Sequence, residues 1–156
     1  MIKFTKNHFK TVKSVEWSDV IKKLAVEFDT GSVNFIAEGK EVPPTFAMHS
    51  NYYPGSITNA YEEVKDVMGI NEMHIYTSLG SKSSTYGKHK DTMDVLIVAA
   101  IGSIIYKFDN DLGRIGRRSL ISHTLDPGDS VFIPKGFYHE PQVVEPRVTL
   151  SFSWPS

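Results

Sequence analysis

The sequence GKHKDTMDVLIV, residues 87–98, decides how the rest of the chain is interpreted. It places His89 and Asp91 two residues apart, at the start of an apolar run. Side chains at positions i and i+2 of a β-strand point to the same face, so we expect this imidazole and this carboxylate to lie together. They would supply two ligands of a two-histidine, one-carboxylate metal site, which leaves coordination positions open for chemistry. On its own, the pair is also typical of an ordinary surface strand.

A second segment supplies a third ligand. Residues 128–139, GDSVFIPKGFYH, indicate a turn, a short apolar strand, a second turn and then His139. Because His139 is far from His89 in the sequence, only a tertiary fold can bring the two together. We therefore predict a metal site built from His89, Asp91 and His139. The alternatives are a polar cluster without metal and a metal site without catalysis.

Composition limits the classes of function. The 156 residues carry a formal net charge of −1, which makes duplex nucleic acid an unlikely partner because phosphate contacts need clustered cations. The length is enough for one domain with a buried core. No apolar run approaches the roughly 20 residues that span a bilayer, and the first residues lack the apolar core of a signal peptide. The absence of cysteine excludes thiolate catalysis and fits a cytoplasmic protein.

Residues 1–70 are expected to form a scaffold with two helices. The first is predicted from a cap at Ser18 to Phe28, and the second from Ser56 or Asn59 to just before Gly69. Their expected apolar faces are Val20, Ile21, Leu24 and Phe28, and Ala60, Val64, Val67 and Met68. We expect a short strand over 33–36, a turn-rich segment over 39–54 and a solvated, lysine-rich terminus over 1–13. The two helices could support a homodimer.

Residues 71–156 read as a β core that completes a single domain. Strands are predicted over 72–79, 94–101, 103–108, 119–125, 129–134, 138–144 and 147–154. We expect a hairpin around Gly102, and an exposed basic loop over 110–119 that could alternatively contact an anionic partner. Many short strands separated by regular turn signals are typical of an all-β barrel or jelly roll.

Two stretches resemble the cupin superfamily. They are HKDTMDVLIVAAIGSIIYKF over 89–108 and LDPGDSVFIPKGFYHEPQVVEPRVTLSFSW over 125–154. The spacing Gly128-x5-Pro134-x-Gly136-x2-His139 resembles the second cupin motif. His89-x-Asp91, in place of the usual His-x-His, resembles the JmjC-type cupins, and is most similar to their bacterial and ribosomal-oxygenase branch.

This resemblance implies a mainly β fold, the cupin double-stranded β-helix jelly roll, here with two N-terminal helices. It also implies iron(II) held by His89, Asp91 and His139, with 2-oxoglutarate as the cosubstrate. Three protein ligands leave three positions for a bidentate 2-oxo acid and dioxygen.

The sequence departs from the family at the residue that usually binds the distal carboxylate of 2-oxoglutarate. The family places a lysine or arginine there, whereas this chain has Ile104. We expect Arg147 to substitute, because an arginine fork matches a carboxylate bidentately. The alternative is that Arg147 pairs with Glu140 or Glu145.

Four further side chains are expected to contact the cosubstrate. Thr149 and Ser151 share the face of Arg147 on the last strand. His74 and Tyr76 share a face of the first core strand, although His74 could instead be a satisfied core histidine.

The leading hypothesis is an iron(II)- and 2-oxoglutarate-dependent oxygenase, a hydroxylase acting on an unidentified protein side chain or small molecule. One alternative is a non-enzymatic cupin that binds a metal or ligand. Another is a metal-dependent cupin enzyme that does not use 2-oxoglutarate. The position of Arg147 relative to the metal site discriminates between them.

Overall fold

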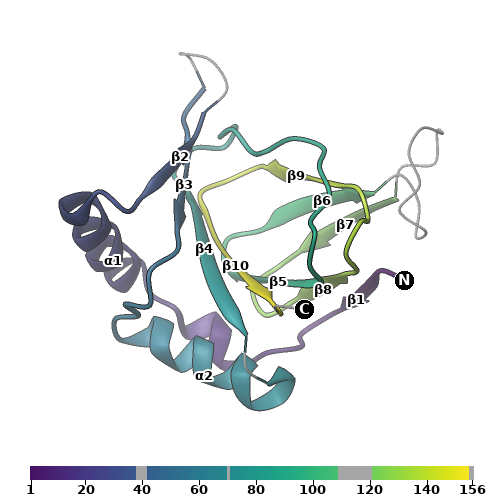
Figure 1. Ribbon diagram of the computed structural model, residues 1–156, viewed down its shortest axis with the longest axis horizontal. Coiled ribbons are helices and arrows are strands. Elements are labelled where there is room, and N and C mark those ends of the chain that lie inside the picture. Colours follow the sequence, from purple (N-terminus) through teal and green to yellow (C-terminus); the bar gives the residue numbers. More distant parts are fainter. Residues whose placement is uncertain (38–41, 70, 109–120, 155–156) are drawn as a thin grey trace.

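A computed structural model describes residues 1–37, 42–69, 71–108 and 121–154. Two antiparallel sheets enclose the centre of the molecule, and the helices lie outside the larger sheet (Figure 1). The helices are η1 (Thr11–Ser14, a 3-10 turn), α1 (Trp17–Thr30) and α2 (Ser56–Met68). The strands are β1 (Lys3–Thr5), β2 (Asn34–Ile36), β3 (Thr45–Met48), β4 (Glu72–Ser78), β5 (Val95–Ile101), β6 (Ile104–Phe108), β7 (Ile121–Leu125), β8 (Ser130–Ile133), β9 (His139–Val143) and β10 (Arg147–Ser153).

The seven-stranded sheet has the order β1-β8-β5-β10-β4-β3-β2, and the three-stranded sheet has the order β7-β6-β9. Strand β5 confirms the prediction of a strand buried on both faces. Its residues Leu96 and Val98 pack in a core beneath the helices, whereas Val95 and Ile97 belong to a second core between the sheets. This arrangement is a mainly β jelly roll with two helices on one side, as the sequence predicted.

The predicted hairpin around Gly102 is wrong. Strand β5 pairs with β8 and β10, whereas β6 pairs with β7 and β9, so the turn carries the chain from one sheet to the other. Gly102 has a φ of 70°, and a Cβ there would collide with the backbone oxygen of Pro146. The close approach of the β9–β10 turn therefore requires glycine at this crossing.

The first 70 residues supply three strands as well as helices. The expectation of a solvated terminus is wrong at residues 3–5, because β1 pairs with β8 at the edge of the large sheet. Strand β3, within the segment expected to be turns, pairs with β4. The predicted strand over 33–36 is confirmed by β2.

Helix boundaries were predicted better than helix faces. Gly31, with φ 72°, ends α1, and α2 begins at Ser56 as expected. The cap position of α1 is Glu16, not Ser18, so that prediction is wrong. Among the residues assigned to apolar faces, several are largely exposed: Ile21, Phe28 and Val67.

Two expectations lie wholly or partly outside the described part of the chain, namely the basic loop over 110–119 and the start of the turn-rich segment over 39–54. No helix in the described ranges is long and apolar enough to cross a membrane. The assignment of 1–70 and 71–156 to the scaffold and core of one domain stays a prediction, as does a homodimer.

Candidate metal centre

His89, Asp91 and His139 converge from two segments. Their potential ligand atoms all lie within 4.8 Å of one another. His139 begins β9, whereas His89 and Asp91 lie in the segment before β5, which makes an isolated bridge to His139 and is not the strand that the sequence predicted. This segment is fixed to β9 by two backbone hydrogen bonds between His89 and His139, of 2.9 and 2.8 Å. A third bond, from the Gly136 amide to the Asp91 carbonyl, is 2.8 Å long.

The two imidazoles are oriented for a metal. Nδ1 of His89 lies 2.8 Å from the Gly87 carbonyl oxygen, and Nδ1 of His139 lies 3.0 Å from that of Phe137. A carbonyl oxygen can only accept, so each Nδ1 carries the proton and each Nε2 keeps its lone pair. Both Nε2 atoms face Asp91, at 3.9 Å from Oδ1 for His89 and 3.4 Å from Oδ2 for His139. Such backbone partners typically fix metal-ligating histidines.

The Asp91 carboxyl group is held in its charged form. Partial burial opposes the charge, but the neighbouring imidazoles of His139 and His89 outweigh it and keep the pKa of Asp91 below its ordinary value. A carboxylate and two neutral imidazoles suit a divalent first-row metal such as iron(II). The residues present therefore fit the metal that the sequence predicted.

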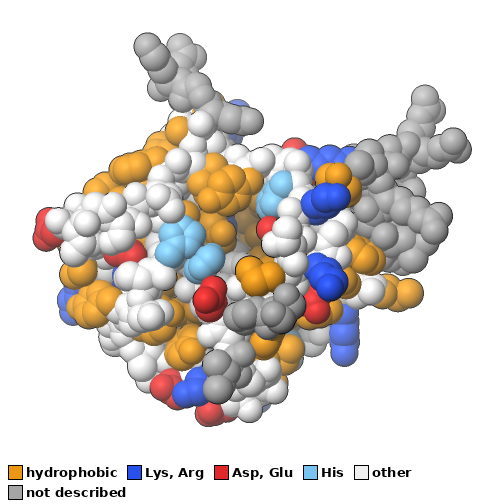
Figure 2. All heavy atoms as spheres, in the orientation of Figure 1, with side chains coloured by type: hydrophobic (Ala, Val, Ile, Leu, Met, Phe, Trp, Pro, Cys, Tyr) orange, Lys and Arg blue, Asp and Glu red, His pale blue; other side chains and the backbone are white. Residues whose placement is uncertain are grey.

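The three side chains line a cavity of about 530 Å³ between the two sheets. Its wall also includes Arg147, Tyr76 and Tyr106. Figure 2 shows that the molecule is hollowed on this face and that histidine side chains lie on both sides of the hollow. The described lining residues are Ile36, His49, His74, Tyr76, Thr85, Tyr86, His89, Asp91, Thr92, Met93, Val95, Ile97, Tyr106, His139, Pro141, Arg147, Ser151 and Ser153.

Arg147 is a buried cation in this wall, with 3% of its surface exposed. Its Nε donates to Ser78 Oγ at 2.8 Å, and Ser78 Oγ lies 2.8 Å from Thr45 Oγ1. Thr45 Oγ1 in turn donates to the Ser84 carbonyl, so the Ser78 hydroxyl must donate to Thr45 and accept from Arg147. This directional chain fixes the guanidinium through its Nε.

The terminal nitrogens of Arg147 remain available to a ligand. In the part of the chain that the structure describes, they have no hydrogen-bond partner, and Arg147 makes no ion pair with Glu140 or Glu145. Glu145 instead accepts a bond from the Ser103 amide. Burial lowers the pKa of Arg147, while Tyr106 and Tyr76 act in the opposite direction. An arginine nonetheless stays charged at neutral pH, so the cavity holds a buried cation without a described counter-ion.

Two tyrosines adjoin this cation. Burial raises the pKa of Tyr106 to about 12 and also raises the pKa of Tyr76. Both phenols are therefore protonated at neutral pH and can donate hydrogen bonds to an anionic ligand. Tyr106 was missed in the sequence, where its strand was examined only for a basic residue.

The last strand has the alternation that the sequence predicted. Arg147 and Ser151 line the cavity, whereas Val148 and Leu150 pack in the core beneath the helices. Thr149 lies opposite Tyr76 in the pairing of β10 with β4, but it is fully buried and does not line the cavity. The register of β10 against β5 shifts between Val148 and Thr149.

His74 lines the cavity together with a histidine that sequence reasoning missed. The rings of His49 and His74 lie edge to face, with centroids 4.2 Å apart. His49 directly follows β3. The prolines before this strand indicated turns, so no sequence signal placed His49 in the cavity wall.

The fold is shared with solved cupin-like structures. The Escherichia coli ribosomal oxygenase YcfD superposes with a TM-score of 0.72 and 18% identity, covering 99% of this chain and 48% of that one. Its complex with cobalt and 2-oxoglutarate gives a TM-score of 0.73 at 18% identity, covering 100% and 48%. A cupin superfamily protein from Desulfitobacterium hafniense matches with a TM-score of 0.50 and 11% identity over 76% and 84%.

These likenesses confirm the predicted cupin jelly roll and its similarity in fold to a ribosomal oxygenase. The present chain spans about half the length of the YcfD chain. No protein-family model matches the sequence, and the search of curated proteins found no match.

Proposed function

We propose that the protein is an iron(II)- and 2-oxoglutarate-dependent oxygenase that hydroxylates an unidentified substrate. One observation carries this proposal. The cavity that contains the two-histidine, one-carboxylate cluster also contains Arg147, a buried cation whose terminal nitrogens have no partner among the described residues. A buried charge without a counter-ion is costly, so this arrangement favours an anionic ligand beside the metal.

His89, Asp91 and His139 would hold the iron. When bound, iron(II) would supply the activation of dioxygen, coupled to decarboxylation of 2-oxoglutarate to succinate and carbon dioxide. The protein needs no separate acid or base for this chemistry. Its part is to hold the ligands, orient the cosubstrate and keep water away.

Arg147 and the two tyrosines would bind the distal carboxylate of 2-oxoglutarate. The guanidinium can form a bidentate pair, and Tyr76 and Tyr106 can donate to the same or a neighbouring oxygen. Thr149 would support this end of the cavity from beside Tyr76. The Ser78–Thr45 chain positions the arginine so that little of its conformational freedom remains to be lost on binding.

The comparison with a 2-oxoglutarate complex of a ribosomal oxygenase agrees with this proposal, but it establishes a fold and not an activity. Protein side chains and small molecules both remain candidate substrates. A cytoplasmic location stays a prediction.

One observation favours a second candidate, a metal-dependent cupin enzyme that does not use 2-oxoglutarate. Ile104, at the family's usual basic position, is fully buried in the core between the sheets. If Arg147 does not bind a carboxylate, the cavity would lack the basic partner that a dicarboxylate needs.

Calorimetric titration of 2-oxoglutarate into anaerobic iron(II)-loaded protein tests the proposal. We expect micromolar binding that requires the metal and is weakened at least about ten-fold in Arg147→Met. Lys107→Met is the matched control, because Lys107 is a cation on β6 that does not line the cavity. An absence of 2-oxoglutarate binding to metal-loaded protein would reject this function and favour the second candidate.

A further inference from the structure

The cavity has a second polar region at the other end of its wall. His49 follows β3, His74 lies on β4, and Ser151 is the register partner of His74 on β10. All three line the cavity, and together they make a polar row across neighbouring strands. Ser153 extends the row along β10.

This region is separate from the arginine end. Ser151 is four residues beyond Arg147, which is about 13 Å along a strand. The bond from Arg147 to Ser78, its register partner on β4, keeps the guanidinium at its own end. The carboxyl carbons of 2-oxoglutarate are joined by four C–C bonds of about 1.5 Å and can be at most about 6 Å apart. A cosubstrate anchored at Arg147 therefore leaves the histidines free.

The two histidines have unused hydrogen-bonding capacity. Nε2 of His49 is buried and has no hydrogen-bond partner among the residues that the structure describes, although most buried polar atoms have one. Burial lowers the pKa of both imidazoles, so both are neutral at pH 7. A neutral imidazole offers one donor and one acceptor, which is complementary to a group that itself offers both.

The charged side chains that line the cavity are few, and they belong to the metal cluster and to the arginine end. Among the described lining residues, Asp91 is the one carboxylate, and it belongs to the metal cluster. Arg147 is the one lysine or arginine in the same set, and it lies at the opposite end. Glu27 and Lys23 act electrostatically on His49, and Glu72 acts on His74, but none of these three side chains lines the cavity. The wall beside the histidines therefore presents neutral groups to a ligand.

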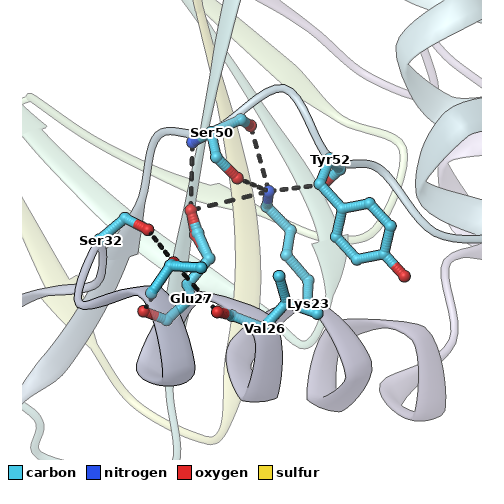
Figure 3. Close-up of polar contacts among 7 residues, drawn as sticks. Lys23, Val26, Glu27, Ser32, Ser50 and Tyr52 are labelled. Carbon is cyan, nitrogen blue, oxygen red and sulfur yellow. Dashed lines mark hydrogen bonds and ion pairs between the residues drawn. The ribbon is translucent and has the colours of Figure 1, made fainter.

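Helix α1 holds His49 in the wall through a buried ion pair. Lys23 and Glu27 are both fully buried, with Lys23 Nζ 3.9 Å from Glu27 Oε1. Lys23 Nζ donates to the Ser50 carbonyl and hydroxyl at 3.1 Å and to the Tyr52 carbonyl at 2.6 Å (Figure 3). The Ser50 amide donates to Glu27 Oε1 at 3.1 Å. The backbone of Ser50, which directly follows His49, is thus held through both its amide and its carbonyl group.

We propose that His49 and His74 form the subsite for a neutral carboxamide group of the substrate, and that Lys23 and Glu27 are positioning residues for His49. The proposal rests on the proposed function, because it assigns the substrate and not the cosubstrate to this end of the cavity. It also reassigns His74 and Ser151, which the sequence had placed against 2-oxoglutarate.

The test uses NMR of histidine side chains in zinc(II)-loaded protein saturated with 2-oxoglutarate. Acetamide represents a side-chain amide, N-methylacetamide represents a peptide bond, and acetate and methylammonium are charged controls. We expect millimolar binding of one or both amides, with shifts in the His49 and His74 ring resonances and none with the charged probes. Shifts confined to other residues, or equal shifts with acetate, would overturn the proposal.

Variants test the role of each histidine. His49→Ala and His74→Ala should each weaken amide binding about three- to ten-fold, the effect of one hydrogen bond, with metal and 2-oxoglutarate affinity unchanged. Unchanged amide affinity in both variants would contradict the assignment.

A test of the positioning role of Lys23 and Glu27 requires a variant that still folds. Lys23→Met with Glu27→Gln removes both buried charges while keeping much of their volume, and Lys22→Met removes an exposed lysine from the same helix. In the folded double variant we expect displaced His49 resonances, with those of His123 on β7 unchanged, and a loss of amide affinity similar to that of His49→Ala. Native His49 resonances and native amide affinity would show that the pair serves stability alone.

The outcomes separate this inference from the proposed function. If 2-oxoglutarate binds but neither amide perturbs the two histidines, the subsite is wrong and the cosubstrate assignment stands. If the amides bind at the histidines while 2-oxoglutarate does not bind, the oxygenase proposal fails and the carboxamide site stands.

Discussion

His89 and His139 exchange two backbone hydrogen bonds, so the two imidazoles of the metal cluster are fixed relative to each other by the main chain. Their ring centroids lie 4.3 Å apart, and each Nδ1 is oriented toward a carbonyl oxygen. The main chain and the two carbonyl oxygens therefore hold both imidazoles in a defined orientation. Little rearrangement should be needed on loading, which favours tight binding.

Removal of one imidazole should remove most of the metal affinity. We expect His89→Ala to weaken cobalt(II) binding by about 100-fold or more, since loss of partners that only support ligands already costs 10- to 100-fold. Titration followed by the visible absorption of cobalt(II) measures this. His123→Ala, on β7 and outside the cavity, is the control, and an equal loss there would mean that cobalt binds elsewhere.

Loss of the Ser78 hydroxyl should affect the cosubstrate and not the metal. Ser78→Ala frees Arg147 Nε and breaks the chain to Thr45, so the guanidinium is no longer held in place. We expect 2-oxoglutarate affinity to fall roughly three- to ten-fold, as for one lost hydrogen bond, with metal affinity unchanged. Calorimetry on metal-loaded protein measures both. An unchanged 2-oxoglutarate affinity would show that Arg147 needs no such support.

Removing one charge of the buried pair on α1 should destabilise the protein more than removing both charges. Lys23→Met leaves Glu27 charged and buried, and we expect the free energy of unfolding to fall by about 3–5 kcal/mol. Lys23→Met with Glu27→Leu should be much less destabilising, because neither charge remains. Urea unfolding measures the difference, and a double variant as unstable as the single one would contradict this explanation.

The hydrogen bonds at the start of α2 should make a pH-dependent contribution to the stability of the fold. Asp19 accepts bonds from the Ser56 hydroxyl at 2.6 Å and the Ser56 amide at 2.8 Å, and these bonds lower its pKa below 3.8. A lowered pKa means that the stabilisation is present above about pH 4 and is lost as the pH falls through the folded-state value.

Asp19→Asn should therefore unfold at a lower temperature than the wild type at pH 7, with the difference shrinking below about pH 4. Thermal unfolding across this range measures it, with Asp66→Asn as a control on α2. A difference that does not change with pH would show that the carboxylate charge is unimportant.

Gly55, at the cap position of α2, should not tolerate alanine. Its φ is 52°, and a Cβ would come within 2.5 Å of the Asp19 carboxylate. Gly55→Ala should lower the melting temperature, whereas Gly31→Ala, with a positive φ but open space, should lower it less. Equal losses would show that backbone strain alone matters.

The cluster of His89, Asp91 and His139 could be predicted because its side chains are few, chemically distinctive and spaced as in a known motif. Arg147 could be predicted from the alternation of the last strand, which the structure confirms. Its neighbours Ser78 and Thr45 could not, because ordinary serine and threonine residues acquire a role only through the pairing of β3, β4 and β10.

The features that sequence reasoning missed or got wrong have a common physical cause. Nothing in the sequence marks Lys23 and Glu27 as buried, because the loop that supplies Ser50 and Tyr52 is distant in the chain. Likewise, a single Gly102 cannot distinguish a hairpin from a crossing between sheets. Both depend on contacts between segments that are remote in sequence.

The most direct test of the account is the visible absorption spectrum of anaerobic iron(II)-loaded protein during addition of 2-oxoglutarate. Bidentate binding of a 2-oxo acid to iron(II) produces a charge-transfer band, so the measurement reports the metal and the cosubstrate at once. We predict that the band appears for the wild type, requires much more 2-oxoglutarate in Arg147→Met, and is absent in His139→Ala. Iron-loaded wild-type protein that shows no band at saturating 2-oxoglutarate would contradict the central claim.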